Sequence, residues 1–173
     1  MSSFVSAKRR LLSLLCSVLA VLGCGSREGS EADPAPALPF ASAPLYLIAG
    51  PDTVRLSAEL AMSADQQRLG LMERRHLADT AGMIFLYMSE QPASDGFWMF
   101  RTRIPLDIAF MDSLGTIRAI QHMVPCPTDM AQGCPSYAPG VPYRSALEVN
   151  AGYLARHGLD IGSRIILPDT HGK

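Results

Sequence analysis

The chain has 173 residues, a formal net charge of −1 and a hydrophobic fraction of 48%. This length favours a single folded domain that is large enough to bury a core of its own. Without the first 23 residues, 12 basic and 16 acidic residues remain, which gives a net charge of −4. Because the basic residues are scattered along a mildly acidic chain, the sequence lacks the charge pattern of a nucleic-acid-binding protein, and we expect no nucleic-acid partner.

The N-terminal segment predicts an export signal that ends in a lipid attachment site. Residues 8–10 are basic, and the apolar stretch over residues 11–22 is too short to span a bilayer as a helix. The stretch ends in Val21-Leu22-Gly23-Cys24, which resembles the bacterial lipobox. Residues 1–23 are therefore predicted to be a lipoprotein signal peptide. The alternatives are cleavage after Ala20 without lipidation and a retained membrane helix.

A lipid on Cys24 predicts where the protein works. Several acyl chains together anchor a protein durably to a membrane. We therefore expect a lipid-anchored protein of the bacterial cell envelope that faces the periplasm. The glycine after Cys24 favours the outer membrane over the inner one.

Three further segments follow the signal. Residues 24–44 are predicted to be the lipidated cysteine and a disordered tether, because they hold four prolines and few large apolar side chains. Residues 45–168 are predicted to form a single β-rich domain, and residues 169–173 a short tail.

Period-two hydrophobic patterns predict strands along most of the domain. The expected strands are residues 45–49, 54–60, 82–87, 97–102, 106–110, 116–124, 143–149 and 164–167. One short helix is expected to begin at Ser63, to carry Leu69 and Met72 inward and to end near Arg74. A second is expected to be capped by Asn150 and to stop at Gly158. This pattern predicts a mainly β fold, a small β-sandwich or barrel-like domain with two short helices.

The remaining cysteines predict a disulfide. Cys16 leaves with the signal and Cys24 takes the lipid, so Cys126 and Cys134 remain in an oxidising compartment. The alternative is a metal site with His122 and Asp129, but a spacing of seven residues between the cysteines matches no common zinc pattern. We expect no metal, and no cofactor because no phosphate-binding glycine loop is present.

The sequence resembles the domain of unknown function 192 family, also called uncharacterised protein family 0127, over residues 54–167. The stretches that carry the resemblance are Gly70-Leu71-Met72-Glu73-Arg74, Gly82-Met83-Ile84-Phe85, Phe97-Trp98-Met99, Ile104-Pro105-Leu106-Asp107-Ile108-Ala109-Phe110 and Leu147-Glu148-Val149-Asn150-Ala151-Gly152. Where the family usually has Lys-Asn-Thr after Trp-Met, this chain has Phe100-Arg101-Thr102. The resemblance implies a small, mainly β domain that is often exported and has no established activity.

Two carboxylates are the candidate catalytic residues. Asp107 and Glu148 each lie inside an otherwise apolar strand, where an unpaired charge costs several kcal/mol. They could act as general acid and base across a cleft. The structural alternative is that each accepts a hydrogen bond from, or forms an ion pair with, Arg74, Arg101 or Arg103.

Four other residues complete the candidate binding site: Arg74, Trp98, Arg101 and Asn150. Arg74 and the adjacent Arg75 could bind an anion or a carboxylate, although a solvated or salt-bridged role is the simpler interpretation. Trp98, the single tryptophan, could form a binding platform, although its neighbours favour a place in the core. Asn150 already has a structural interpretation as a helix cap.

These observations predict a non-catalytic module that binds an unknown envelope protein, peptide or glycan. The alternative is a periplasmic hydrolase that cleaves a cell-wall or polysaccharide bond with Asp107 and Glu148.

Overall fold

The computed structural model describes residues 38–167. The predicted signal peptide, Cys24, most of the predicted tether and the predicted tail lie outside these residues. Within them, none of the helices has the length and apolar composition needed to cross a bilayer.

Seven strands form one sheet in the order β6-β5-β8-β3-β2-β1-β9. Their bounds are β1 Ala41–Ala49, β2 Asp52–Ala61, β3 Ala81–Gln91, β5 Leu106–Met111, β6 Ile117–Met123, β8 Tyr143–Asn150 and β9 Arg164–Ile166. Neighbouring strands are antiparallel except β2 and β3, which are parallel. The predicted mainly β fold is confirmed.

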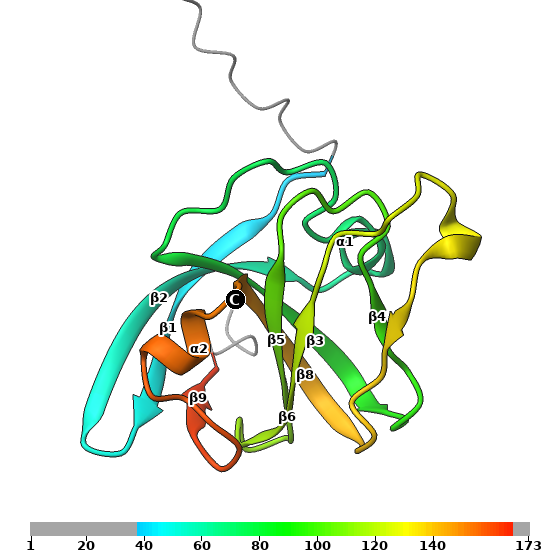
Figure 1. Ribbon diagram of the computed structural model, residues 1–173. Helices are drawn as coiled ribbons and strands as arrows, with labels where there is room; N and C mark the ends of the chain where they lie inside the picture. The colour runs from blue at the N-terminus through cyan, green and yellow to red at the C-terminus, as the bar shows by residue number, and fades with distance from the viewer. Residues whose placement is uncertain (1–37, 168–173) are drawn as a thin grey trace, which may run out of the picture. The chain divides into compact units, whose positions relative to one another are not determined.

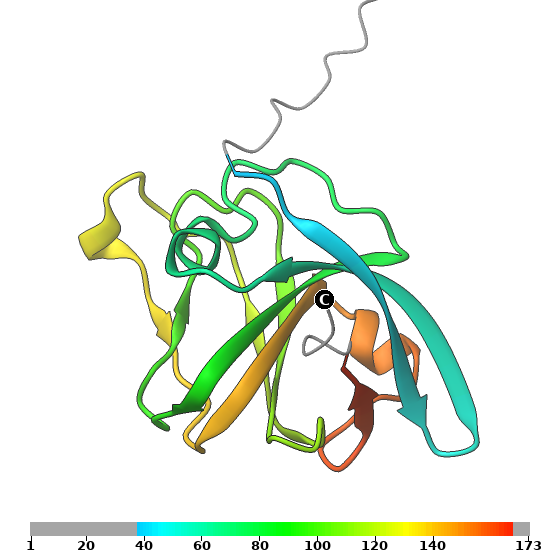
Figure 2. The same cartoon turned by 180° about the vertical axis from the view of Figure 1, so that it is seen from behind.

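The sheet curls into a half-barrel, so that its two edge strands meet at one end (Figures 1 and 2). An isolated bridge joins Thr116, just before β6, to Arg164 of β9. The Ile117 amide donates to the Ser163 carbonyl at 2.9 Å, and the Ile165 amide donates to the Gly115 carbonyl at 2.8 Å. This contact pairs backbone groups that an open sheet would leave without partners.

Both faces of the central strands are buried. One apolar cluster includes Leu147, Val149 and Ile84 and packs under α2, which spans Tyr153–Arg156. The other includes Ile108, Phe110 and Phe85 and packs under the segment that follows α1 and under β4. Every residue of β5 is therefore buried, including Asp107. The apolar run predicted for residues 82–87 has the same explanation, because a strand covered on both faces does not alternate.

The first helix confirms the predicted start but not the predicted end. α1 spans Ala64–Leu69, and Ser63 and Gln66 form the expected capping box. The chain leaves the helix at Gly70, which has a φ of +48°, so the helix ends before Arg74. Leu71, just after the helix, is the fully buried side chain of this segment, whereas the expected Leu69 and Met72 are only partly buried.

Two further strand predictions need correction. β1 begins at Ala41, inside the segment predicted as tether. The strand expected over residues 97–102 is reduced to β4, Phe97–Trp98, because the chain turns immediately afterwards and the Thr102 amide donates to the Met99 carbonyl. β4 pairs with β7, Ser136–Tyr137, in a separate two-stranded ribbon that the sequence did not predict.

Candidate functional site

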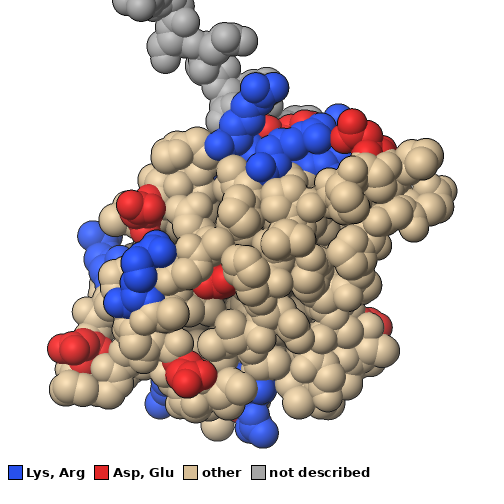
Figure 3. All heavy atoms as spheres, viewed as in Figure 1, with Lys and Arg blue, Asp and Glu red and all other residues tan. Residues whose placement is uncertain are grey.

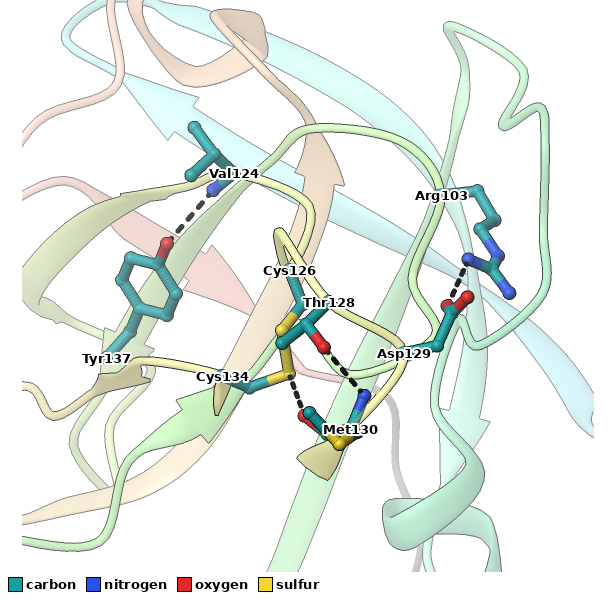
Figure 4. Close-up of a disulfide and its surroundings, with 8 residues drawn as sticks. All are labelled: Arg103, Val124, Cys126, Thr128, Asp129, Met130, Cys134 and Tyr137. Atoms are coloured by element: carbon teal, nitrogen blue, oxygen red, sulfur yellow. Dashed lines mark hydrogen bonds and ion pairs between the residues drawn. A yellow bond between two sulfur atoms is a disulfide. The ribbon is translucent and has the colours of Figure 1, made fainter. Parts of the chain in front are cut away.

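The long loop over residues 125–142 is pinned beside β4 and presents the β4–β7 ribbon at the end of the domain away from the β1–β2 hairpin (Figures 1 and 2). Cys126 and Cys134 form a disulfide, with their Cα atoms 5.2 Å apart, so the predicted pairing is confirmed (Figure 4). The Tyr137 hydroxyl accepts from the Val124 amide at 3.2 Å. The loop therefore holds β7 where it can pair with Trp98 of β4.

A glycine allows this pairing. A side chain at Gly96 would place its Cβ 2.5 Å from the Ser136 hydroxyl and 2.8 Å from the Ala138 backbone nitrogen, closer than real Cβ atoms approach. The absence of a Cβ at residue 96 thus brings the loop backbone against β4.

Two turns next to the ribbon are held in an unfavourable backbone conformation. Glu73 and Arg101 both have positive φ angles, 61° and 57°, which residues other than glycine rarely adopt. The Glu73 amide donates to the Arg101 carbonyl at 2.7 Å, and the two side chains form an ion pair. Such conformations persist only where the surrounding structure fixes them, and they concentrate at functional sites.

Glu148 lies on β8 and is one of four buried polar or charged residues in the described part of the chain. Its side chain is buried, with 5% of the residue exposed, and no hydrogen bond or ion pair joins its carboxyl group to any described residue. Burial raises the pKa of Glu148 to about 8. A carboxylic acid in this position is therefore mostly protonated at neutral pH, and a cationic partner would favour its ionised form.

Glu148 is one of the residues that line a cavity of about 30 Å³. Its apolar walls come from the end of α1 and the turn after it, from β3 and from β4: they are Leu69, Leu71, Met72, Phe85, Phe97 and Trp98. Gln67, Arg68 and Thr102 add polar groups. Since one water needs roughly 10–15 Å³ of such space, the cavity fits two or three waters or the end group of a larger ligand.

Trp98 forms one wall of this cavity and is 43% exposed. The interpretation that Trp98 belongs to the core is therefore wrong, because β4 pairs with β7 outside the main sheet. Its ring lies 5.4 Å from that of Phe100 at an interplanar angle of 38°. The neighbouring Met99 points inward and is fully buried, so alternation brings the indole to the surface.

The arginines do not pair with the candidate carboxylates, contrary to the structural alternative. Arg74 donates to both Glu59 carboxylate oxygens at 2.6 Å in a half-buried pair. Arg101 and Arg103 both pair with Glu73, and Arg103 also pairs with Asp129 of the disulfide loop (Figure 4).

Hydrogen bonds to both arginines lower the pKa of the Glu73 carboxyl group, the larger effect coming from Arg103. Figure 3, drawn in the same view as Figure 1, shows charged side chains gathered at the upper edge of the molecule, while most of the centre of this view carries no charge.

Asp107 faces the opposite side of the sheet. One oxygen of its carboxylate lies 2.9 Å from His122 Nδ1, and the other accepts from the Gly152 amide at 2.7 Å. Asp107 and His122 line a second cavity, of about 410 Å³, with Ile120, Leu154, Leu159 and Asp160 among the walls. Asp107 thus caps the N-terminus of α2 from a neighbouring strand.

The strand register separates the two carboxylates. β5 and β8 are antiparallel neighbours in which Ile108 lies opposite Glu148 and Asp107 lies opposite Val149. Residues opposite each other share a face, so Glu148 lies on the Ile108 face and Asp107 on the other. The expectation that they act as general acid and base across one cleft is therefore wrong.

Asn150 does not cap α2, because the helix begins after Gly152 and has no side-chain cap of its own. The Asn150 amide instead donates to the Leu77 carbonyl at 2.8 Å and so holds the segment before β3. Of the six predicted site residues, only Trp98 and Glu148 line the same cavity, and Arg74, Arg101, Asp107 and Asn150 do not line it.

Sequence reasoning missed Arg68, Thr102 and His122 as site residues. His122 lies opposite Asp107 in the β5–β6 register, which hairpin pairing around residues 112–115 could have revealed. Residues 38–167 contain no group of three or more His, Cys, Asp or Glu side chains that could hold a metal ion.

Two solved structures and one family model are similar to this chain. A search of curated proteins gives no match. A crystal structure described as a putative transcription regulator from Sinorhizobium meliloti 1021 is 34% identical, covers 75% of this chain and 95% of its own, and has a TM-score of 0.66. A protein of unknown function from Novosphingobium aromaticivorans DSM 12444 is 30% identical, covers 76% and 89%, and also has a TM-score of 0.66. Residues 47–167 match DUF192, described as Uncharacterized ACR, and the chain therefore belongs to this family.

Proposed function

We propose that this protein is an envelope binding module that holds an end group of a partner peptide or glycan in the cavity between Trp98 and Glu148. One observation carries the proposal: a buried carboxyl group without a partner among the described residues faces a cavity with an exposed tryptophan in its wall. A buried polar group normally has a hydrogen-bond partner, and a buried polar group that lacks one destabilises the fold. A ligand that supplied this partner would recover the free energy lost on burial.

The surroundings of the cavity support binding. A backbone hydrogen bond and an ion pair between Glu73 and Arg101 hold two turns together near it, and β7 of the disulfide loop pairs with β4. A binding site on supported elements loses little conformational entropy when a ligand arrives. The indole of Trp98 offers the apolar face that sugar rings and aliphatic side chains bind.

The fluorescence of Trp98 gives a direct test, because the chain contains one tryptophan. Small amines, alcohols, amides and monosaccharides should be titrated into the wild type, Glu148→Gln and Asp160→Asn. At least one class is expected to bind the wild type and to lose tenfold or more in affinity in Glu148→Gln. Asp160→Asn changes a carboxylate of the other cavity and should have no effect. If no class binds, or if Glu148→Gln binds all of them as the wild type does, this cavity is not the binding site.

The envelope location is part of the same proposal. It is supported by the resemblance of residues 21–24 to a lipobox and by the disulfide, since disulfides persist in oxidising compartments. The test is the intact mass of protein purified from membranes. A mass that begins at Cys24 with added acyl chains is expected, and an unlipidated mass that begins elsewhere would contradict the anchor.

A further inference from the structure

We propose that the group bound at Glu148 is the ammonium end of an aliphatic primary amine, with its methylene chain against the apolar walls of the cavity. This inference rests on the proposed function, because it names the ligand class of that site.

The shape of the cavity limits what can enter. At about 30 Å³ it takes only the end of a ligand. Leu69, Leu71, Phe97 and Trp98 line the cavity together with Glu148, so a group bound at Glu148 has apolar surface around it. An unbranched methylene chain matches such walls, whereas a sugar ring is too large and carries hydroxyl groups that would find few partners there.

The carboxyl group of Glu148 selects the end group of the ligand. A carboxylate only accepts hydrogen bonds, and a primary ammonium group carries three donors and the opposite charge. Aromatic faces add to this preference, because cations are attracted to the faces of Trp and Phe rings. Trp98, Phe85 and Phe97 all line the cavity.

The charged and titratable groups around Glu148 permit a cation. Among the described residues that line the cavity, Arg68 of α1 is the one other charged side chain, and it is exposed and paired with Asp65 at 2.6 Å. Tyr87 of β3 is near enough to interact electrostatically with Glu148, and burial raises the pKa of its hydroxyl, which keeps it neutral. Asp107 of β5 lies on the other face. The residues after α1 and those of β4 that line the cavity are apolar, and Thr102 adds an uncharged hydroxyl group.

Binding is therefore coupled to proton release. In the free protein Glu148 keeps its proton up to a pH of about 8, and the proton goes to solvent when the ammonium group binds the carboxylate. The apparent affinity for an amine should rise about tenfold per pH unit between pH 6 and pH 8 and then level off. A neutral ligand of the same length should show no such rise.

The experiment compares n-butylamine with 1-butanol by Trp98 fluorescence at pH 6, 7, 8 and 9 and constant ionic strength. We expect n-butylamine to bind at least tenfold more tightly than 1-butanol at pH 8, with the predicted rise from pH 6. Glu148→Gln should lose at least tenfold in amine affinity at pH 8, whereas Glu90→Gln, which changes an exposed carboxylate, should lose none.

Three results would overturn the inference: equal affinities for the two probes, an amine affinity independent of pH, or an unchanged affinity in Glu148→Gln. If 1-butanol or an amide bound at Glu148 better than the amine, the proposed function would stand and the amine assignment would fail. If neither probe nor any compound of the wider panel bound, both would fail.

A second pair of probes separates the sources of the amine. Nα-acetyl-lysine amide is compared with n-butylamine, and Nα-acetyl-norleucine amide serves as its uncharged control. Tighter binding of the lysine derivative supports a lysine side chain of a peptide as the natural ligand, and weaker binding supports a free aliphatic amine. Equal binding of the lysine and norleucine derivatives would contradict the inference.

Discussion

Replacing Glu148 with glutamine should stabilise the protein, and the gain should grow with pH. In the unfolded chain this carboxyl group ionises near its ordinary value of 4.5, whereas in the folded protein burial raises its pKa to about 8. Between these values the folded protein binds one proton more than the unfolded chain, so rising pH favours unfolding.

The size of the effect follows from the two pKa values. Each pH unit well inside this window costs about 1.4 kcal/mol, so Glu148 should destabilise the protein by about 3 kcal/mol at pH 7 and by about 4 kcal/mol at pH 8, relative to pH 4.5. Glutamine has nearly the same shape as the protonated acid and does not titrate. The stability difference between Glu148→Gln and the wild type should therefore increase by about 1.4 kcal/mol per pH unit around pH 6 to pH 7, and less steeply as the pH approaches 8.

Urea denaturation at pH 5, 6, 7 and 8, followed by far-UV circular dichroism and with the disulfide intact, measures this difference. Glu90→Gln is the matched control, and its stability should stay within about 0.5 kcal/mol of the wild type at every pH. A difference between Glu148→Gln and the wild type that stays constant from pH 5 to pH 8 would refute the reasoning. It would mean that Glu148 is ionised and paired in the folded protein.

Three further predictions concern a hydrogen bond, a disulfide and an ion pair that stabilise the fold. Asp107→Ala removes the carboxylate that accepts from the amide of Gly152, the residue just before α2, and should cost about 1–3 kcal/mol of unfolding free energy, measured by urea denaturation; a loss below about 0.5 kcal/mol would contradict this capping role. Replacing Cys126 and Cys134 with serine removes a cross-link over a separation of 8 residues and should cost about 2.5 kcal/mol in the chain-entropy model, measured by urea denaturation against the oxidised wild type; the reduced wild type should show a similar loss, and an unchanged stability in both would contradict the prediction. Arg74→Lys loses the two-pronged contact with Glu59 and should cost about 1 kcal/mol; a double-mutant cycle with Glu59→Gln that gives no coupling energy would exclude this contribution.

Local sequence patterns predicted the elements well where a segment had a clear hydrophobic alternation or a recognisable helix cap. The alternation over residues 54–60 and the capping box at Ser63 and Gln66 are both present in the structure. The seven-stranded order depends on contacts between distant segments, such as the parallel pairing of β2 with β3. No single segment carries that information, so the sequence left a sandwich and a barrel as equal choices.

The candidate site was harder to predict, because burial depends on the covering elements. Trp98 was expected in the core since its neighbours are apolar, yet β4 leaves the sheet and exposes it. Asp107 and Glu148 were correctly identified as carboxyl groups on buried strands, but their faces depend on the register between β5 and β8. Asn150 was assigned to the nearest helix, whereas its amide binds a carbonyl 73 residues away in the chain.

The pairing of the first strand with the last has a consequence for how the chain folds. β9 lies along β1, with Leu47 opposite Ile165, so the edge of the sheet is complete only when nearly the whole described chain has been synthesised. Contacts between such distant residues slow folding, because the chain must close a long loop before it gains them. Until β9 arrives, β1 presents an unpaired backbone edge that can recruit other chains. Loss of the last strand should therefore promote aggregation more than loss of stability alone would suggest.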